Sequence, residues 1–123
     1  MKRIKTLIVD DSAHFREVLK VILDKDPSID VIGLLNSGED CLKFVRKHKV
    51  DLVMMDARLP GLDGPQTIRK LKKQCPNIKT IICTVWPENE AKIYSKEAGA
   101  EGYFVKGEAV RILLKKIHSI FSC

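Results

Sequence analysis

The chain has 123 residues, 45% of them hydrophobic, and a formal net charge of +6 at pH 7. This length suits one globular domain with a core and is too short for a regulatory domain joined to an effector domain, so we expect residues 1–123 to form a single domain. No stretch approaches the roughly 18 uncharged apolar residues of a membrane span, and Met1-Lys2-Arg3 leads into an apolar run rather than a signal peptide. These features predict a cytoplasmic protein without a membrane partner.

The excess of basic residues does not by itself indicate nucleic-acid binding. The basic clusters, Lys43–Lys49, Arg69–Lys73 and Lys115-Lys116, fall on the polar sides of expected helices. No aromatic residues are interleaved with them and no helix-turn-helix pattern accompanies them, so solvated helix faces are the favoured interpretation. The four cysteines are widely spaced and form no CxxC pair, which argues against a zinc site.

Hydrophobic periodicity predicts a regular alternation of strands and helices along the whole chain. Each expected strand is a short apolar run, and each expected helix repeats its apolar residues at helical spacing. The expected strands are 4–9, 30–35, 51–55, 78–83 and 102–105, and the expected helices are about 13–25, 38–48, 65–75, 88–98 and 108–121.

Residues with special roles at helix ends agree with these boundaries. Ser12 and Ser37 can cap the first two helices, because a serine hydroxyl accepts hydrogen bonds from otherwise unpaired amides of the first turn. Pro65 and Pro87 suit first-turn positions, where the missing N–H is no loss. Gly99 can end the fourth helix in the left-handed conformation.

Strict alternation of apolar strands and helices predicts a doubly wound α/β fold. Right-handed crossovers place helices on both faces of a five-stranded parallel sheet, and the flavodoxin-like order 2-1-3-4-5 is expected. In such sheets ligands bind beyond the carboxyl ends of the strands, where the strand order reverses. Asp10 and Asp11, which follow the first strand, and Asp56, which follows the third, are expected to flank that crevice.

The residues at the strand ends suggest phosphoryl chemistry. Three gathered carboxylates repel one another unless a hard divalent cation neutralises them, while Thr84 and Lys106, after the fourth and fifth strands, can receive phosphate oxygens. No histidine base is patterned beside a serine or threonine, so a carboxylate is the expected nucleophile. Asp56 is best placed, because it precedes the Pro- and Gly-containing loop 59–64.

At this point the chain resembles the response-regulator receiver family over its whole length. A lone Asp-Asp pair would be weak support, but the same residue types stand on four strand ends in the family's order and spacing. The matching positions are Asp10-Asp11, Met55-Asp56 followed by Pro60 and Gly64, Thr84, and Gly102-Tyr103 followed by Lys106.

The resemblance implies a phosphorylation-controlled signalling module rather than an enzyme acting on a metabolite. It makes Asp56 the phosphoacceptor, with Mg²⁺ (or Mn²⁺ in its place) bound by Asp10, Asp11, Asp56 and the backbone carbonyl of Arg58. It also implies that Lys106 and Thr84 contact the phosphoryl group and that Thr84 and Tyr103 switch conformation.

The resemblance implies one partner that supplies the phosphoryl group and another that receives the signal. A sensor histidine kinase or a histidine phosphotransfer protein would supply the phosphoryl group. The output would pass through the surface of helix 88–98, strand 102–105 and helix 108–121 to a downstream protein, a fused effector domain or a second copy in a homodimer. No direct contact with nucleic acid is expected from this domain.

Several positions depart from the commonest pattern of the family. Val85 stands where a small residue is usual and is expected to narrow access to the site. Arg58 and Trp86, each two residues beyond a site residue, are expected to overhang the site and set the lifetime of the phosphorylated form. Gly107 replaces the usual proline after Lys106, so a cis peptide bond is not assumed there.

Other functions remain open at this level. A receiver fold that binds partners without phosphorylation would fit the large side chains of Val85 and Trp86, and the chain could equally be the N-terminal receiver of a DNA-binding transcription regulator. An aspartate-nucleophile phosphohydrolase of another α/β family is disfavoured, because position 58 is arginine rather than a second acid. A flavodoxin is disfavoured because no Ser/Thr-rich phosphate loop follows the first strand.

Overall fold

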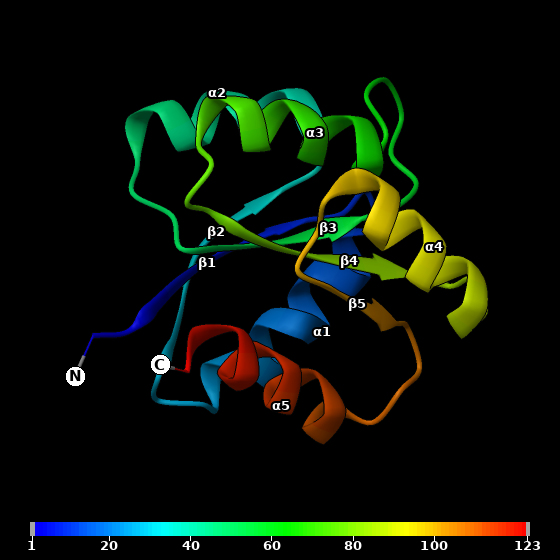
Figure 1. Cartoon of the computed structure of the whole chain (residues 1–123). Coiled ribbons are helices and arrows are strands. Elements are labelled where there is room, and N and C mark those ends of the chain that lie inside the picture. Colours follow the sequence, from blue (N-terminus) through cyan, green and yellow to red (C-terminus); the bar gives the residue numbers. More distant parts are fainter. Residues whose placement is uncertain (1, 123) are drawn as a thin grey trace.

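The computed structural model describes residues 2–122 as five strands that alternate with five helices (Figure 1). Each strand is followed by a helix, as the periodicity predicts. The strands are β1 (Ile4–Val9), β2 (Ile29–Leu35), β3 (Leu52–Asp56), β4 (Lys79–Thr84) and β5 (Gly102–Val105), and the helices are α1 (Ala13–Asp24), α2 (Gly38–Lys47), α3 (Gly64–Gln74), α4 (Glu88–Ala98) and α5 (Val110–Phe121).

The strands form one parallel sheet in the order β2-β1-β3-β4-β5, which confirms the predicted topology. The order reverses between β1 and β3, so the carboxyl ends of these two neighbours open on the same crevice. Val9 pairs with Met55, and Asp56 pairs with Cys83 of β4. This register brings Asp10 and Asp56 to the same edge of the sheet.

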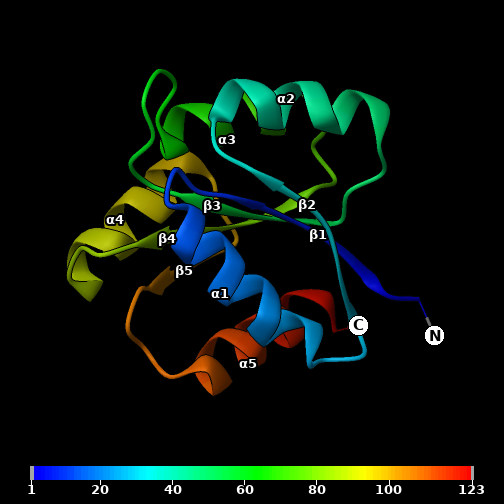
Figure 2. The ribbon, with the colours of Figure 1, turned by 180° about the vertical axis from the view of Figure 1, so that it is seen from behind.

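The helices cover both faces of the sheet (Figure 2), and each face has its own hydrophobic core. One core lies under α2 and α3 and includes Leu7, Val53 and Ile68, whereas the other lies under α1 and α5 and includes Leu23 and Leu113. Side chains of β1, β3 and β4 alternate between the two cores, which explains why these strands read as continuous apolar runs. None of the described helices combines the length and the apolar character that a bilayer crossing requires.

The predicted helix signals act largely as expected. The Ser12 and Ser37 hydroxyls accept hydrogen bonds from the amides of Phe15 and Asp40, and Gly99 ends α4 with φ of 81°. Pro65 lies in the first turn of α3. Pro87 is instead the residue that precedes the first turn of α4; its ψ of 155° keeps it extended, so α4 begins at Glu88 with no side-chain cap.

The last helix begins later than the predicted residue 108. The amide of Glu108 donates to the carbonyl of Val105, and the Glu108 carboxylate accepts from the Val105 amide. These two bonds close a turn that holds Glu108 outside the helix, so α5 begins at Val110. The other predicted boundaries differ from the observed ones by one residue at most.

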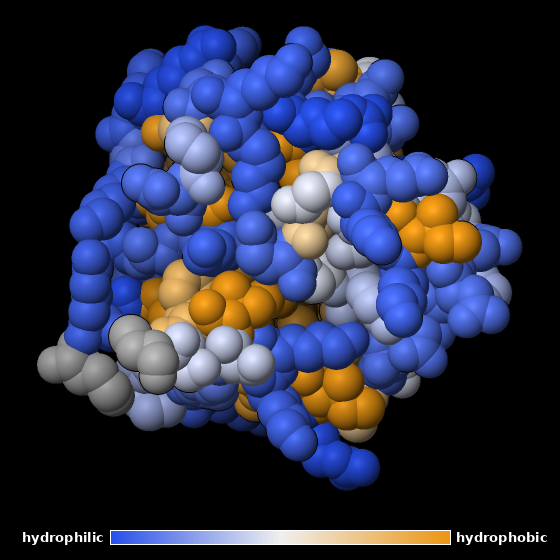
Figure 3. Space-filling model, in the orientation of Figure 1, coloured by the Kyte–Doolittle hydropathy of each residue, from blue (hydrophilic) through white to orange (hydrophobic). Residues whose placement is uncertain are grey.

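Polar side chains dominate the surface over α2 and α3, whereas a separate hydrophobic patch lies over α4 (Figure 3). The two large hydrophobic side chains of α4, Ile93 and Tyr94, are both exposed. The layer of α2 and α3 thus faces solvent with charged residues, and α4 presents a mixed surface.

Candidate functional site

Three carboxylates meet at the carboxyl end of the sheet, as the sequence predicts. Asp10 follows β1 and is 1% exposed, Asp56 ends β3 and is 6% exposed, and Asp11 is open to solvent. One oxygen from each lies within 4.8 Å of the others. Three acidic oxygens this close together can share one cation.

Backbone hydrogen bonds fix the two buried acids. The Asp10 carboxylate accepts from the Ser12 amide at 2.9 Å, and its main-chain carbonyl accepts from the Arg16 guanidinium at 2.5 Å. The Asp56 carboxylate accepts from the Arg58 amide at 3.3 Å. The loop after β3 then folds back so tightly that a Cβ on Gly64 would lie 2.3 Å from the Asp56 carbonyl oxygen, which explains why glycine stands there.

Lys106 reaches the acids from the end of β5. Its ammonium lies 2.8 Å from an Asp10 oxygen and 3.6 Å from an Asp56 oxygen, and it sits 4.2 Å from the centre of the Phe15 ring. Burial lowers the pKa of Lys106, but the hydrogen bond to Asp10 and the charge of Asp56 outweigh it, so the net shift is upward. Lys106 is therefore a fixed cation that partly neutralises the cluster.

Asp56 is the acid whose ionisation is most disturbed. Burial is the main cause that raises its pKa to about 6; the charge of Lys106 opposes this rise, and the charges of Asp10 and Asp11 add to it. When all three acids are ionised, the one ammonium does not neutralise their negative charge. Mg²⁺ prefers negatively charged oxygen ligands in proteins, so this set of carboxylates fits the ion.

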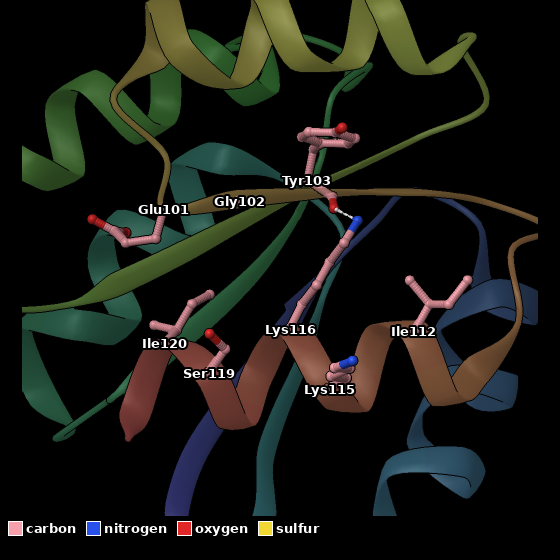
Figure 4. Close-up of a pocket in the computed structure, with 8 residues that line it drawn as sticks. All are labelled: Glu101, Gly102, Tyr103, Ile112, Lys115, Lys116, Ser119 and Ile120. Carbon is pink, nitrogen blue, oxygen red and sulfur yellow. Dashed lines mark hydrogen bonds between the residues drawn. The ribbon is translucent and has the colours of Figure 1, made fainter. Parts of the chain in front are cut away.

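Thr84 is the last residue of β4, and Tyr103 lies on β5. Thr84 is 2% exposed, and its hydroxyl oxygen accepts a hydrogen bond from the Trp86 amide at 3.0 Å. The Tyr103 hydroxyl donates to Glu88 at the start of α4, and its ring points toward that helix and away from α5 (Figure 4). Lys116 of α5 donates to the Tyr103 carbonyl and lies 4.4 Å from the ring centre.

Four positions depart from the commonest pattern of the family: Arg58, Val85, Trp86 and Gly107. The Arg58 guanidinium is 5.6 Å from the centre of the Trp86 ring, and Trp86 packs against Tyr94 of α4 with ring centres 4.5 Å apart. Val85 is 68% exposed. Gly107 has φ of 102°, a left-handed conformation that proline cannot adopt, and the described residues contain no cis peptide bond.

Sequence reasoning missed several residues that contact the site. Phe15 packs on Lys106 and Arg16 holds the Asp10 carbonyl, while Tyr94 reaches Trp86 from α4. A signal for the first two was present, because both fall in the first turn of the helix that begins just after the acids. Tyr94 had no such signal, because its contact depends on where α4 lies.

The comparisons agree with this geometry. A family model described as response regulator receiver domain matches residues 6–118. The response regulator GacA of Pseudomonas aeruginosa is 36% identical over 97% of the chain, and the response regulator UvrY of Escherichia coli K12 is 36% identical over the same share. The chain spans 56% of the length of GacA and 55% of that of UvrY.

Solved structures have the same fold. A CheY-like response regulator receiver domain from Methanospirillum hungatei is 28% identical and superposes with a TM-score of 0.85 over 97% of this chain and 94% of that one. A LuxR-family response regulator from Aurantimonas, 24% identical, superposes with a TM-score of 0.90 over 97% of this chain and 85% of that one. Family model, relatives and fold all lead to one conclusion: the chain belongs to the response regulator receiver domain family of two-component systems.

Proposed function

We propose that this domain accepts a phosphoryl group on Asp56 and signals through the change that follows. Receiver domains in general bind Mg²⁺ at an acidic pocket, and the cluster of Asp10, Asp11 and Asp56 is such a pocket. The observation that carries the proposal is the placement of Lys106 against two of these three acids, because it puts a cation where phosphoryl oxygens would need one.

The ligands proposed for Mg²⁺ are the carboxylates of Asp10, Asp11 and Asp56 and the backbone carbonyl of Arg58, with Mn²⁺ as a substitute. Bound there, the ion would neutralise the acids and the charge on the phosphoryl oxygens. Residues of the chain itself would carry out the phosphoryl transfer. An Asp56 oxygen attacks phosphorus, the bond from phosphorus to the donor's imidazole nitrogen breaks, and the imidazole leaves with the electron pair. Lys106 holds the phosphoryl oxygens during this transfer.

Asp56 must be ionised to act as the nucleophile. Its pKa of about 6 leaves the carboxylate mostly ionised near neutral pH but makes it more basic than an ordinary aspartate. Burial of the Asp56 carboxylate thus favours its attack on phosphorus, and the charge of Lys106 stabilises the ionised carboxylate. The acyl phosphate that results is later hydrolysed, with Arg58, Val85 and Trp86 proposed to control access of water.

The proposed switch runs through Thr84 and Tyr103. The Thr84 hydroxyl would leave the Trp86 amide and bond to the phosphoryl group, and Tyr103 would leave Glu88 and turn inward. This would change the surface of α4, β5 and α5, which includes a hollow of about 460 Å³ between β5 and α5 (Figure 4). We propose this surface as the site of output and of homodimer formation.

The proposed phosphodonor is a sensor histidine kinase or a histidine phosphotransfer protein. GacA and UvrY are response regulators about twice the length of the matched segment. Their length supports the proposal that this domain works with a fused effector domain, for which DNA binding is the leading candidate, rather than through direct contact of its own with nucleic acid. Residues 1–123 would then act as one receiver unit within that regulator.

The test is acceptance of a small phosphodonor. The protein is incubated with acetyl phosphate, with and without Mg²⁺, and its intact mass is measured beside that of Asp56→Asn. We expect a mass increase of one phosphoryl group in the wild type only, and only with the metal. No increase in the wild type, together with no binding of beryllofluoride, would refute the proposal and favour a receiver that binds partners without phosphorylation.

A further inference from the structure

Trp86 is packed between two side chains from different parts of the chain. The Arg58 guanidinium, from the loop after β3, lies 5.6 Å from the ring centre, and the Tyr94 ring of α4 lies 4.5 Å away with an angle of 33° between the planes. Trp86 also packs against the core under α2 and α3. The ring is therefore a fixed point to which both the loop and α4 attach.

The backbone of Trp86 is tied to the switch residue itself. Its amide donates to the Thr84 hydroxyl oxygen at 3.0 Å, and that oxygen is almost fully buried. If the Thr84 side chain rotates toward a phosphoryl group on Asp56, the oxygen leaves this amide. An amide that loses its hydrogen-bond partner is destabilised until it finds another, so the segment at Trp86 would be favoured to move.

Helix α4 packs against β5, α3 and β4. Its buried side chains are all small, Ala91, Ser95 and Ala98, and its first turn has no side-chain cap. Its side-chain contacts include the Ser95 hydroxyl, which donates to the Gly102 carbonyl, the Tyr94 ring against Trp86, and Glu88, which accepts from the Tyr103 hydroxyl. Small buried side chains remove little apolar area from water, so the contact of the large Tyr94 ring with Trp86 adds measurably to what holds the helix.

We infer that the stack of Arg58, Trp86 and Tyr94 is a latch that holds α4 in the unphosphorylated position and is released when Thr84 turns toward the phosphoryl group. The inference rests on the proposed function and adds a second route to α4 beside that of Tyr103. It assigns Tyr94 as a positioning residue, which touches no reacting atom. A latch that stabilises only the resting form must oppose phosphorylation by the same free energy.

The test measures whether Tyr94, remote from the chemistry, changes affinity for a phosphoryl mimic. Beryllofluoride binding in the presence of Mg²⁺ is followed by the fluorine NMR signal, Trp86 fluorescence and hydrogen exchange of the α4 amides. Aromatic pairs contribute about 0.5–1.5 kcal/mol, so Tyr94→Leu should bind beryllofluoride roughly twofold to tenfold more tightly. It should also exchange its α4 amides faster without ligand and show a smaller fluorescence change on binding.

Two variants serve as controls. Tyr94→Phe keeps the ring and should behave as the wild type, whereas Ile93→Ala truncates the neighbouring exposed side chain and should leave beryllofluoride affinity unchanged. Wild-type affinity in Tyr94→Leu, or unchanged Trp86 fluorescence in a wild-type complex that the fluorine signal shows to be formed, overturns the latch. If the wild type binds no beryllofluoride, the proposed function fails instead, and the exchange of α4 without ligand still decides whether the stack holds the helix.

Discussion

Replacing Asp56 with asparagine should stabilise the metal-free protein at neutral pH. The carboxylate is 6% exposed and shares its pocket with Asp10 and Asp11, and burial with these charges raises its pKa to about 6. A raised pKa means that folding works against the ionised form. The amide of Asp56→Asn has nearly the same shape and carries no charge, so it escapes this penalty.

The magnitude follows from the shift. The ordinary value for the side chain is 3.8 and the folded value is about 6, a difference of about two units. At 1.36 kcal/mol per unit this is about 3 kcal/mol of lost stability when Asp56 is ionised, and the attraction of Lys106 is already included in it. Because an amide replaces the hydrogen bond from the Arg58 amide imperfectly, we expect a gain of about 2 kcal/mol.

The difference in stability between Asp56→Asn and the wild type should depend on pH, because it arises from the ionisation of Asp56. Below about pH 3 the side chain is mostly protonated in both the folded and the unfolded wild type, so Asp56→Asn and wild type should have similar free energies of unfolding. As the pH rises from about 4 to about 6, the unfolded state releases this proton first, wild-type stability falls, and the variant gains its advantage. Above the folded pKa the difference should stay constant.

Urea unfolding with a chelator present, followed by circular dichroism, measures these free energies. Asp11→Asn is the matched control, since Asp11 is exposed and the change should be within about 0.5 kcal/mol. Added Mg²⁺ should stabilise the wild type and narrow its gap to Asp56→Asn. A gap that does not grow between about pH 4 and pH 6, or a variant less stable than the wild type at neutral pH, would refute this account of the site.

Three further predictions test other parts of the structure. Lys106→Met should weaken beryllofluoride binding by about tenfold or more, because a charge-assisted contact is lost, yet it should not weaken Mg²⁺ binding in a fluorescence titration. Gly64→Ala should cost about 2–3 kcal/mol in urea melts, since its Cβ meets backbone at 2.3 Å, whereas Gly99→Ala meets nothing within 4 Å and should cost only about 1 kcal/mol for its positive φ. Burial raises the pKa of Glu101, but hydrogen bonds from Lys72 and Thr80 outweigh burial, and the net pKa is lowered. The ionised Glu101 therefore stabilises the fold above pH 4.5, its ordinary pKa, and this stabilisation is lost as the pH falls through the lowered pKa. Glu101→Gln should therefore lose about 1 kcal/mol at neutral pH and flatten this acid-side fall, as measured by unfolding at each pH.

The part of the site that lies on strand ends could be predicted from sequence. Residues that directly follow neighbouring parallel strands must meet at one edge of the sheet, so Asp10, Asp56 and Lys106 converge once the strand order is known. The strands could be predicted from the apolar runs because their side chains pack alternately into two hydrophobic cores, one on each face of the sheet. These are consequences of topology, which the alternation of elements largely determines.

Contacts that depend on how a helix is placed over the sheet could not be predicted in the same way. Phe15 meets Lys106 because α1 turns one side of its first turn toward the β5 end, and Tyr94 meets Trp86 because of where α4 lies. The Asp63 side chain, which caps α3 in a reciprocal pair with Gln66, was readable from its spacing and was missed. Periodicity gives the buried face of a helix but not its partner across the sheet.

The balance of charge in the site supports the proposed coupling between the metal, the phosphoryl group and the switch. With Asp10, Asp11 and Asp56 ionised, three negative charges exceed the one positive charge of Lys106. This excess adds to burial, which is the main cause that raises the pKa of Asp56. A divalent cation would remove that excess without protonation. It would also free Lys106 from Asp10, its nearer partner at 2.8 Å. In the proposed mechanism, phosphorylation would add negative charge at Asp56, and the ammonium of Lys106 and the hydroxyl of Thr84, whose oxygen accepts from the Trp86 amide, would bind the added oxygens. The Trp86 amide would then lose its hydrogen bond to Thr84, and by the inferred latch this loss would carry the effect of a charge on β3 to α4.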